Sequence, residues 1–128
     1  MRKVALVVIL LNLAVSILHG IAHQTLGVGL SHAQTLFVVV VIAAGPVLAA
    51  FLLRLRFDSS GPMVLLLVMA ASLIFGIWNH YVAMSPDHVS QVSALPNKLW
   101  SHIFQITAAL LAVLETIGAW MAVKLLRR

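Results

Sequence analysis

The chain has 128 residues, of which 62% are hydrophobic and 9% are charged, and its formal net charge is +5 at pH 7. A mean hydropathy of +1.11 lies far above the range of soluble globular domains, so the composition excludes that class and indicates an integral membrane protein. The chain contains no cysteine, which excludes disulfides, thiolate ligands, iron–sulfur clusters and covalently attached c-type haem.

Four apolar stretches are each about 20 residues or longer, enough to cross a hydrocarbon core of roughly 30 Å as helices. They cover residues 4–25, 33–53, 62–84 and 99–126. The segments between them are rich in turn-forming residues. The expected fold is therefore all-α: a single domain, residues 1–128, formed by an integral membrane bundle of four transmembrane helices. The pair Gly45-Pro46 predicts a kink in the second helix.

In the first span, four polar residues recur at spacings of four, three and four: Asn12, Ser16, His19 and His23. At roughly 100° per residue they occupy an arc of about 60° on one side of a helix. Such a stripe is expected to face the interior of the bundle rather than lipid.

The later segments each bring further histidines to the same end of the bundle. His32 opens the second span, His80 lies near the end of the third, His88 is in the following loop, and His102 is in the first turns of the fourth. At about 1.5 Å per residue, four histidines fall at a similar depth, namely His23, His32, His80 and His102. His19 lies about one turn deeper. Four helices thus deliver imidazole groups to one layer.

In the fourth span, Gln105, Glu115 and Thr116 form a broad polar face, whereas Thr107 falls nearly opposite Gln105 and does not belong to it. Together with Ser72 of the third span and with Asn12 and Ser16, these residues define a polar seam that runs inward from the histidines. Glu115 is expected to be protonated or hydrogen-bonded, with Asn12 as its partner. The alternative is that such polar groups only stabilise helix contacts.

The histidines predict a metal site. His-x-x-x-His on one helix, here His19 and His23, places two imidazoles on adjacent turns of one face, the arrangement that helical metal sites use. Adding His80 and His102 gives four nitrogen ligands, with Asp87, His88 and His32 as candidate lids or outer groups. Such ligands suit copper, zinc or iron, and the sequence does not choose among them. Haem b, held by His80 and His102 between facing helices, is the competing cofactor.

Charge predicts the orientation, because basic residues near the ends of spans stay on the cytoplasmic side. One end carries Arg2, Lys3, Arg54, Arg56, Lys124, Arg127 and Arg128, and only Lys98 falls at the other. The expected topology is N-in and C-in in a bacterial inner membrane, with the histidines near the outer leaflet. The lipid bilayer is a sufficient partner for this charge, and binding to nucleic acid is not implied.

Familiar catalytic signatures are missing from the sequence, so no catalytic residue is assigned and activity as an enzyme stays open. Two further functions remain as alternatives to metal or haem binding. One is a non-catalytic accessory or scaffold subunit that forms a homo-oligomer or joins a larger membrane complex. The other is proton or cation transport along the polar seam.

The stretch FGIWNHYVAMSPDHVSQV, followed by WSHIFQITAALLAVLETIGAW, resembles small uncharacterised four-helix bacterial membrane proteins. Their shared features are an Asn-His-aromatic end to the third helix, a Pro-Asp-His-Val loop and a Gln-Thr-Glu-Gly pattern in the fourth helix. The matching residues are Asn79, His80, Pro86, Asp87, His88, Val89, Gln105, Thr107, Glu115 and Gly118. The resemblance covers roughly the second half of the chain and carries over no activity. It implies that Asp87 and His88 belong to the site.

Overall fold

The computed structural model describes residues 1–127, and within this range the chain forms helices and no strands. Four helical segments are long and apolar enough to cross a membrane: Arg2–Leu26, His32–Arg54, Ser60–Val82 and Lys98–Leu126. They confirm the all-α class and the four expected helical segments, with bounds that differ from the expected ones by at most two residues. Large apolar side chains on their outer faces are exposed, as suits a helix surrounded by lipid.

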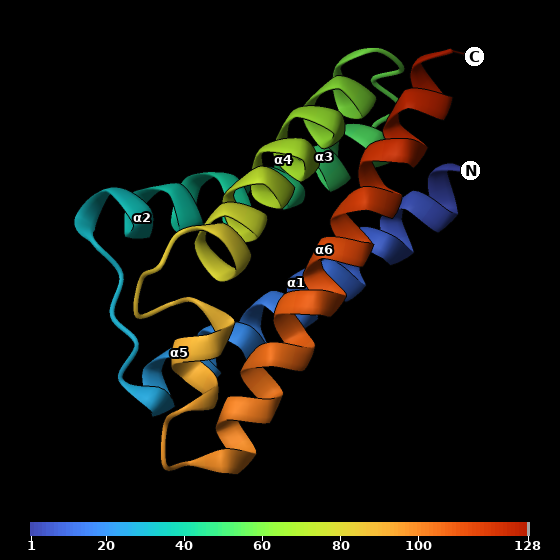
Figure 1. The fold of residues 1–128 in the computed structure, drawn as a ribbon. Coiled ribbons are helices and arrows are strands. Elements are labelled where there is room, and N and C mark those ends of the chain that lie inside the picture. Colours follow the sequence, from blue (N-terminus) through green and yellow to red (C-terminus); the bar gives the residue numbers. More distant parts are fainter. Residues whose placement is uncertain (128) are drawn as a thin grey trace.

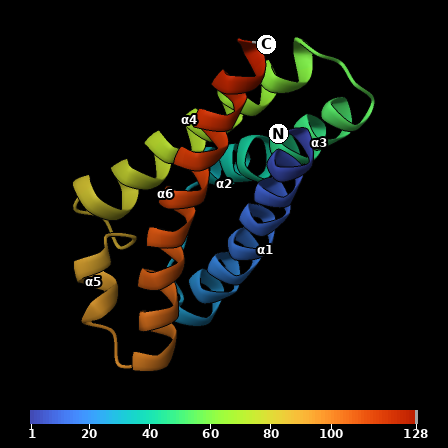
Figure 2. The ribbon, with the colours of Figure 1, turned by 90° about the vertical axis from the view of Figure 1, so that its right-hand side faces the viewer.

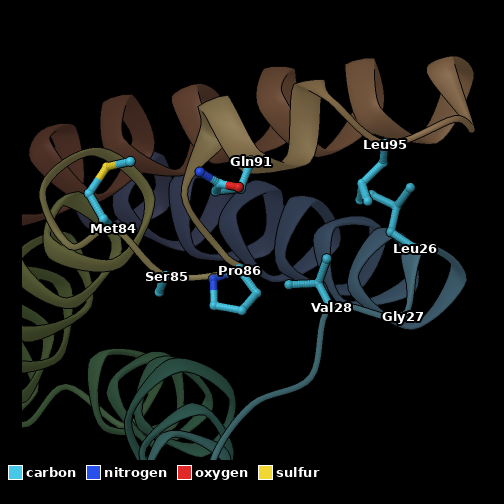
Figure 3. A pocket seen from close by; sticks show the side chains of 8 residues that line it. All are labelled: Leu26, Gly27, Val28, Met84, Ser85, Pro86, Gln91 and Leu95. Carbon is cyan, nitrogen blue, oxygen red and sulfur yellow. The ribbon is translucent and has the colours of Figure 1, made fainter.

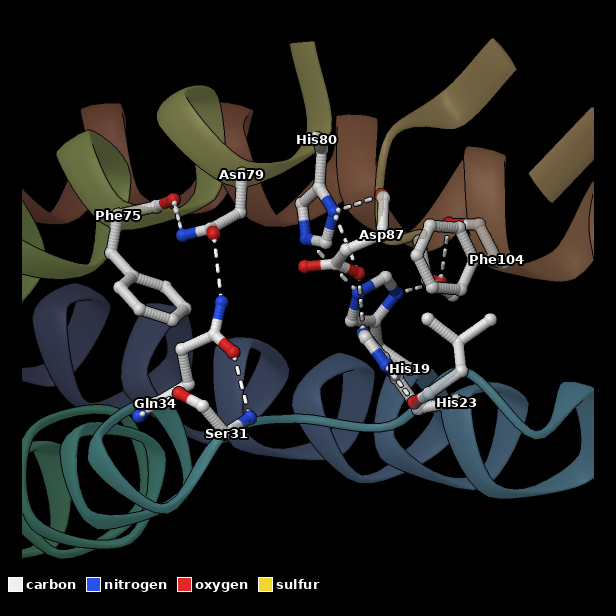
Figure 4. Close-up of polar contacts among 11 residues, drawn as sticks. His19, His23, Ser31, Gln34, Phe75, Asn79, His80, Asp87 and Phe104 are labelled. Atoms are coloured by element: carbon white, nitrogen blue, oxygen red, sulfur yellow. Dashed lines mark hydrogen bonds and ion pairs between the residues drawn. The ribbon is translucent and has the colours of Figure 1, made fainter. Parts of the chain in front are cut away.

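The first span is α1 (Arg2–Leu26), which ends at Gly27, where a φ of 67° lies in the left-handed region that favours glycine. After a short link, α2 (His32–Phe37) begins with a capping box between Ser31 and Gln34. The Nε2 amide of Gln34 then donates to Oδ1 of Asn79 at 2.9 Å. This hydrogen bond joins the start of the second span to the end of the third (Figure 4).

The second span continues from α2 through η1 (Val38–Ala44), a π-helical segment, into α3 (Gly45–Arg54). At Gly45-Pro46, where a kink is expected, the π-helical segment ends, and Pro46 has no N–H to continue the α-helical pattern. Instead, the Gly45 N–H bonds to the carbonyl of Val40. A Cβ at Gly45 would lie 2.5 Å from Cγ1 of Val68, so the glycine allows the second span to approach the third closely.

The fourth span, α6 (Lys98–Leu126), lies between α1 and α4 (Ser60–Ile77) and packs against both, whereas α3 packs mainly on α4 (Figures 1 and 2). The third span ends in η2 (Trp78–Val82), which is also π-helical, and α5 (Val89–Ser93) then folds back onto α6. Towards its start, the second span diverges from α1, as Figure 1 shows for α2.

The two ends of the bundle differ in charge and in packing. Both termini lie at one end, together with the connection from α3 to α4 (Figure 1). We call it the basic end; its described cations are Arg2, Lys3, Arg54, Arg56, Lys124 and Arg127. Arg2 forms an ion pair with Asp58 there. Arg128 lies outside the described residues. Lys98 lies at the opposite end, which we call the histidine end.

The main hydrophobic core occupies the half of the bundle near the basic end. Its buried members come from all four spans: Ala5, Val8, Ile9, Ala49, Leu53, Leu65, Met69, Met121 and Ala122. A second, smaller cluster at the histidine end joins α1, α5 and α6 through Ala22, Val28, Val92 and Phe104. The polar side chains of the candidate site lie beside this second cluster, against Phe104.

Candidate functional site

Three of the six histidines gather at the histidine end, where α1, η2 and α6 meet. His19 and His23 come from adjacent turns of α1, and His80 comes from η2 (Figure 4). One ring nitrogen from each lies within 4.8 Å of those of the other two. His19 and His80 are each 7% exposed. We call these three residues the histidine cluster.

Asp87 closes the histidine cluster from the loop that follows η2. The α pattern stops at the wide turn of η2, and Ala83 then adopts extended backbone, so the chain turns back across the cluster. The carboxylate Oδ1 of Asp87 lies 3.2 Å from Nε2 of His23. The Asp87 side chain is buried, and neither carboxylate oxygen has a hydrogen-bond partner within residues 1–127. The structure therefore places Asp87 beside the histidines, as the sequence suggested.

A hydroxyl on α6 fixes the orientation of the His19 ring. His19 Nδ1 lies 2.8 Å from Oγ1 of Thr107. The Thr107 hydroxyl donates its own proton to backbone carbonyls, of which that of Ile103 is nearest at 2.7 Å. Thr107 must therefore accept from His19, so the proton of the neutral His19 ring is on Nδ1 and its Nε2 carries a free lone pair.

Backbone carbonyls orient the other two rings in the same way. His23 Nδ1 lies 3.1 Å from the carbonyl of Val28, and His80 Nδ1 lies 3.1 Å from the carbonyl of Asp87. Because a carbonyl only accepts, each Nδ1 is the donor. All three neutral imidazoles thus have their protons on Nδ1, and their Nε2 lone pairs are left for another partner.

The atoms that the three histidines turn towards one another are hydrogen-bond acceptors. His19 Nε2 and His80 Nε2 are 3.2 Å apart, which is hydrogen-bond distance, yet neither has a proton to donate in the neutral form. Burial alone would raise the pKa of Asp87, but the attraction of its carboxylate to the His80 ring, whose Nδ1 lies 3.4 Å from Oδ1, and to the rings of His23 and His19 outweighs it and holds that pKa below its ordinary value. An ionised carboxylate therefore adds further acceptors, and such a group is stabilised by a cation.

Phe104 forms the apolar floor of the cluster. Its ring centroid lies 4.5 Å from that of His19, 4.8 Å from that of His23 and 5.3 Å from that of His80, and its side chain is fully buried. The ring excludes water from one side of the three imidazoles. Electrostatic attraction between the cluster and a cation would therefore be stronger there than in water.

The fourth expected ligand, His102, does not join the cluster. It is exposed on α6, because it lies two residues, about 200° around a helix, from the buried Phe104. His80 and His102 therefore do not face one another, and the pair expected to hold haem is not assembled. His32 is exposed at the start of α2. His88 caps α5 through Ser90, so neither of these histidines reaches the cluster.

Thr107 and Phe104 are contacts of the histidine cluster that the sequence analysis missed. Directions around the fourth span that are taken from Gln105 place Thr107 on the wrong side of the helix, because Gln105 is only half-buried and Thr107 is buried. The buried residues of α6 are Ser101, Phe104, Thr107, Ala108, Glu115, Gly118, Met121 and Ala122. Their spacing of three and four residues marks the inward face, and a reading anchored on small and polar residues at this spacing would have included Thr107.

The polar seam is only partly assembled. Gln105 Nε2 donates to the carbonyl of Ser101, and Thr116 Oγ1 to that of Ala112, so both bond to their own helix. Asn12 and Glu115 are buried as expected, with exposures of 1% and 3%. The predicted hydrogen bond between them is not formed: Oδ1 of Asn12 has no partner among the described residues.

A cavity of about 590 Å³ extends along the bundle from the histidine cluster. Its walls come from α1, η1, α4 and α6, and most are apolar. His19, His23, His80 and Asp87 line it at one end. Ser16, Ser72 and Glu115 line it near the middle of the bundle.

A second hollow, of about 470 Å³, lies between the end of α1 and the segment that contains α5 (Figure 3). Its lining includes Leu26, Val28, Met84, Pro86 and Leu95. None of its lining residues is ionisable, so it offers no group for metal binding or acid–base chemistry.

No family model, curated protein sequence or solved structure matches this chain significantly. The chemistry of its function is therefore sought in the residues of the site itself.

Proposed function

We propose that this protein is a multi-pass membrane protein that binds one divalent transition-metal ion through Nε2 of His19, His23 and His80. One observation carries the proposal: all three Nδ1 protons are taken up by protein acceptors, so three lone pairs converge without a proton between them. Metal-binding histidines characteristically donate their other N–H in this way, which fixes the tautomer and the direction of the ring.

The spacing of the nitrogens supports the same proposal. Two nitrogens that each lie about 2.0–2.1 Å from a tetrahedral zinc ion are separated by roughly 3.3 Å. Nε2 of His19 and Nε2 of His80 are 3.2 Å apart. Oδ1 of Asp87, 3.2 Å from Nε2 of His23, is positioned as a fourth ligand. Three imidazoles and a carboxylate suit zinc, copper(II) or iron(II), and we take zinc as the reference ion.

Competition among metals is the direct test. The protein is purified in mild detergent, stripped with a chelator, and titrated with zinc, copper(II) and iron(II), with metal content measured by elemental analysis. We expect one ion per chain, and loss of binding in His80→Ala. His102→Ala is the matched control, since it removes an exposed histidine that lies outside the cluster.

Two results would overturn the proposal. One is substoichiometric metal with every ion tested. The other is an equal loss of binding in His80→Ala and His102→Ala, which would mean that metal binds to histidines generally. A Soret band in protein purified from native membrane would indicate haem b instead of a bare ion.

For topology we propose an N-in and C-in arrangement in a bacterial inner membrane, with the cluster near the outer leaflet. The support is the concentration of cations at the basic end, where both termini lie. A reporter enzyme fused after residue 128 is expected to be active only in the cytoplasm. Activity only in the periplasm would reverse this topology.

A second candidate is an accessory or scaffold subunit. The second span favours it, because only 17% of its apolar window is buried within the chain, against 39% for α6. Such an exposed face suits a second copy or the subunits of a larger complex, although lipid also covers apolar helices. Gentle extraction followed by sizing decides: a lone monomer argues against this candidate, and stable co-purification supports it.

Transport along the polar seam has less support. Beyond Glu115, towards the basic end, the bundle is filled by apolar side chains, among them Ile9, Leu65, Met69 and Met121. A hydrated path across the membrane needs polar groups or water where these side chains pack. Cation flux into liposomes that depends on Glu115 would restore this alternative.

A further inference from the structure

The cavity beside the histidine cluster has a polar inner end that the proposed metal site does not use. Its volume of about 590 Å³ is within the range of sites that hold small molecules. Along α6, Thr107 and Glu115 are eight residues apart, which is roughly 12 Å at the rise of an α-helix. A molecule of that length would extend from the imidazoles to Glu115.

Three polar side chains at this inner end have no partner in the protein. Ser72 and Glu115 are 2% and 3% exposed, and within residues 1–127 their side chains make no hydrogen bond. Oγ of Ser16 is buried and also without a partner. All three residues line the cavity. Because buried polar groups are normally hydrogen-bonded, this end of the cavity is built for a polar atom that the chain itself does not supply.

The walls between the two polar ends are apolar. They include Leu13 and Ile17 of α1, Ile42 of η1, Phe75 of α4 and Leu111 of α6. The hydrophobic core seals the cavity towards the basic end, since Ile9, Met69 and Met121 pack there. The cavity is thus a closed-ended site and not part of a channel.

We propose that this cavity binds a neutral, membrane-soluble molecule that carries a hydroxyl or carbonyl oxygen, and that Glu115, Ser16 and Ser72 hold that oxygen. Glu115 forms no ion pair within residues 1–127. In apolar surroundings without a cation, a carboxyl group is favoured in its uncharged form, which donates a hydrogen bond to such an oxygen. An isoprenoid alcohol and a quinone share this chemistry.

Other occupants fit the cavity less well. An acyl chain of a membrane lipid, or an apolar side chain from a second copy, would fill the volume but leave Ser16, Ser72 and Glu115 without partners. A ligand with an oxygen at this depth satisfies them and also buries its apolar body against the walls. The inference does not rest on the proposed metal site, because Glu115 lies about two turns deeper along α6 than Thr107.

Binding of two radiolabelled probes to the purified chain in lipid nanodiscs tests the inference. The probes are farnesol, an isoprenoid alcohol, and decylubiquinone, a quinone. A chelator is present throughout, so failure of metal binding does not affect the result. We expect saturable binding of one molecule per chain by at least one probe, and the tighter probe identifies the source of the oxygen.

Variants locate the binding. Glu115→Leu removes the carboxyl group, and Ala112→Phe fills the cavity. Each is expected to weaken binding by about ten-fold or more, the effect of a lost buried hydrogen bond or of a blocked site. Glu115→Gln keeps hydrogen-bonding groups and should bind within about three-fold of the wild type. Ala109→Phe is the matched control, since Ala109 is exposed on α6 and does not line the cavity.

Ser16→Ala and Ser72→Ala change little volume and provide the same test if Ala112→Phe does not fold. The inference is overturned if neither probe saturates, or if Glu115→Leu, Ser16→Ala and Ser72→Ala bind as the wild type does, because an acyl chain would explain such a cavity. Saturable, Glu115-dependent binding of tetraphenylphosphonium without binding of either probe also overturns it, since the site would then select a cation.

Discussion

His19 Nδ1 on α1 and Thr107 Oγ1 on α6 are 2.8 Å apart, although 88 residues separate them in the chain. The hydroxyl has already donated its proton to its own helix, so it serves His19 only as an acceptor. One side chain of α6 thereby sets which nitrogen of the neighbouring helix faces the cluster. The quality of the site depends on the packing of α1 against α6 as much as on the histidines themselves.

Replacing Thr107 tests this dependence. Thr107→Val keeps the shape of the side chain but removes the acceptor, so His19 loses the partner that holds its proton on Nδ1. We expect zinc affinity to fall by about 10- to 100-fold, the usual effect of losing such an outer partner. Competition with a chromophoric chelator measures the change. Thr107→Ser keeps the hydroxyl and should stay near the wild type; equal losses in both variants would mean that packing, not the hydrogen bond, is responsible.

Asp87→Asn tests the carboxylate separately from the loop. The backbone carbonyl of Asp87, which orients His80, is unchanged by this substitution, so the imidazoles keep their tautomers. We expect weaker zinc binding with the stoichiometry of one ion retained, because three nitrogens remain. Isothermal titration calorimetry separates affinity from stoichiometry. Unchanged affinity would assign the fourth position to water instead of Asp87.

The lowered pKa of Asp87 also predicts a pH dependence of stability in the metal-free chain. Since the pKa of Asp87 in the folded chain lies below its ordinary value of 3.8, the folded state binds fewer protons than the unfolded state near pH 4. The stabilisation by ionised Asp87 is complete above the ordinary pKa and is lost as pH falls through the pKa of the folded chain. In Asp87→Asn this loss should be absent. Thermal unfolding of both chains between about pH 3 and 6, a range that brackets the ordinary pKa, measures this loss of stability. Parallel profiles would contradict the assignment.

Zinc should stabilise the folded chain, because the unfolded chain holds no preformed cluster. At a free zinc concentration of about 100 times the dissociation constant, the added stability is about 2.7 kcal/mol. The effect should decline at acidic pH, because protons then compete with zinc for the imidazole nitrogens. Thermal unfolding with and without zinc checks both statements. An equal zinc effect in His80→Ala would place the bound ion outside the cluster.

Glycine substitutions test the packing of the second span. In Gly45→Ala the new Cβ would meet Cγ1 of Val68 at 2.5 Å, so the helices must separate, and we expect a loss of about 1–3 kcal/mol in unfolding free energy. Gly20→Ala is the control, since no atom lies within 4 Å of its new Cβ. Unfolding in mild denaturant compares the two. Equal stabilities would mean that the second span does not pack on α4 as described.

Much of this arrangement could be predicted from local patterns. The lengths of the apolar stretches gave the four helices, and the spacing of His19 and His23 placed both imidazoles on one face. Depth along each span, which follows from counting residues, correctly brought His80 near them. These properties depend on single helices or on their length, and one sequence contains that information.

The remaining properties depend on how helices rotate about their axes when they pack. Counting residues places His102 at the right depth, but only the packing of Phe104 against α1 and η2 shows that His102 points away. The proton position on His19 depends on a contact with Thr107 that no local pattern specifies. The π-helical turn of η2 redirects the chain after His80, and the sequence of residues 78–82 contains no pattern that predicts this turn.

The hydrogen bond from Gln34 to Asn79 connects the second span to the histidine cluster, so a movement of that span can reach the cluster. Gln34 belongs to the least buried span, and Asn79 directly precedes His80 in the chain. A transmembrane helix changes its tilt when the thickness of the bilayer changes. Tilting of the second span would pull on Asn79 and so displace His80, one of the three proposed metal ligands. Metal affinity is therefore expected to differ between nanodiscs of short-chain and long-chain lipids, and Gln34→Ala should remove the difference.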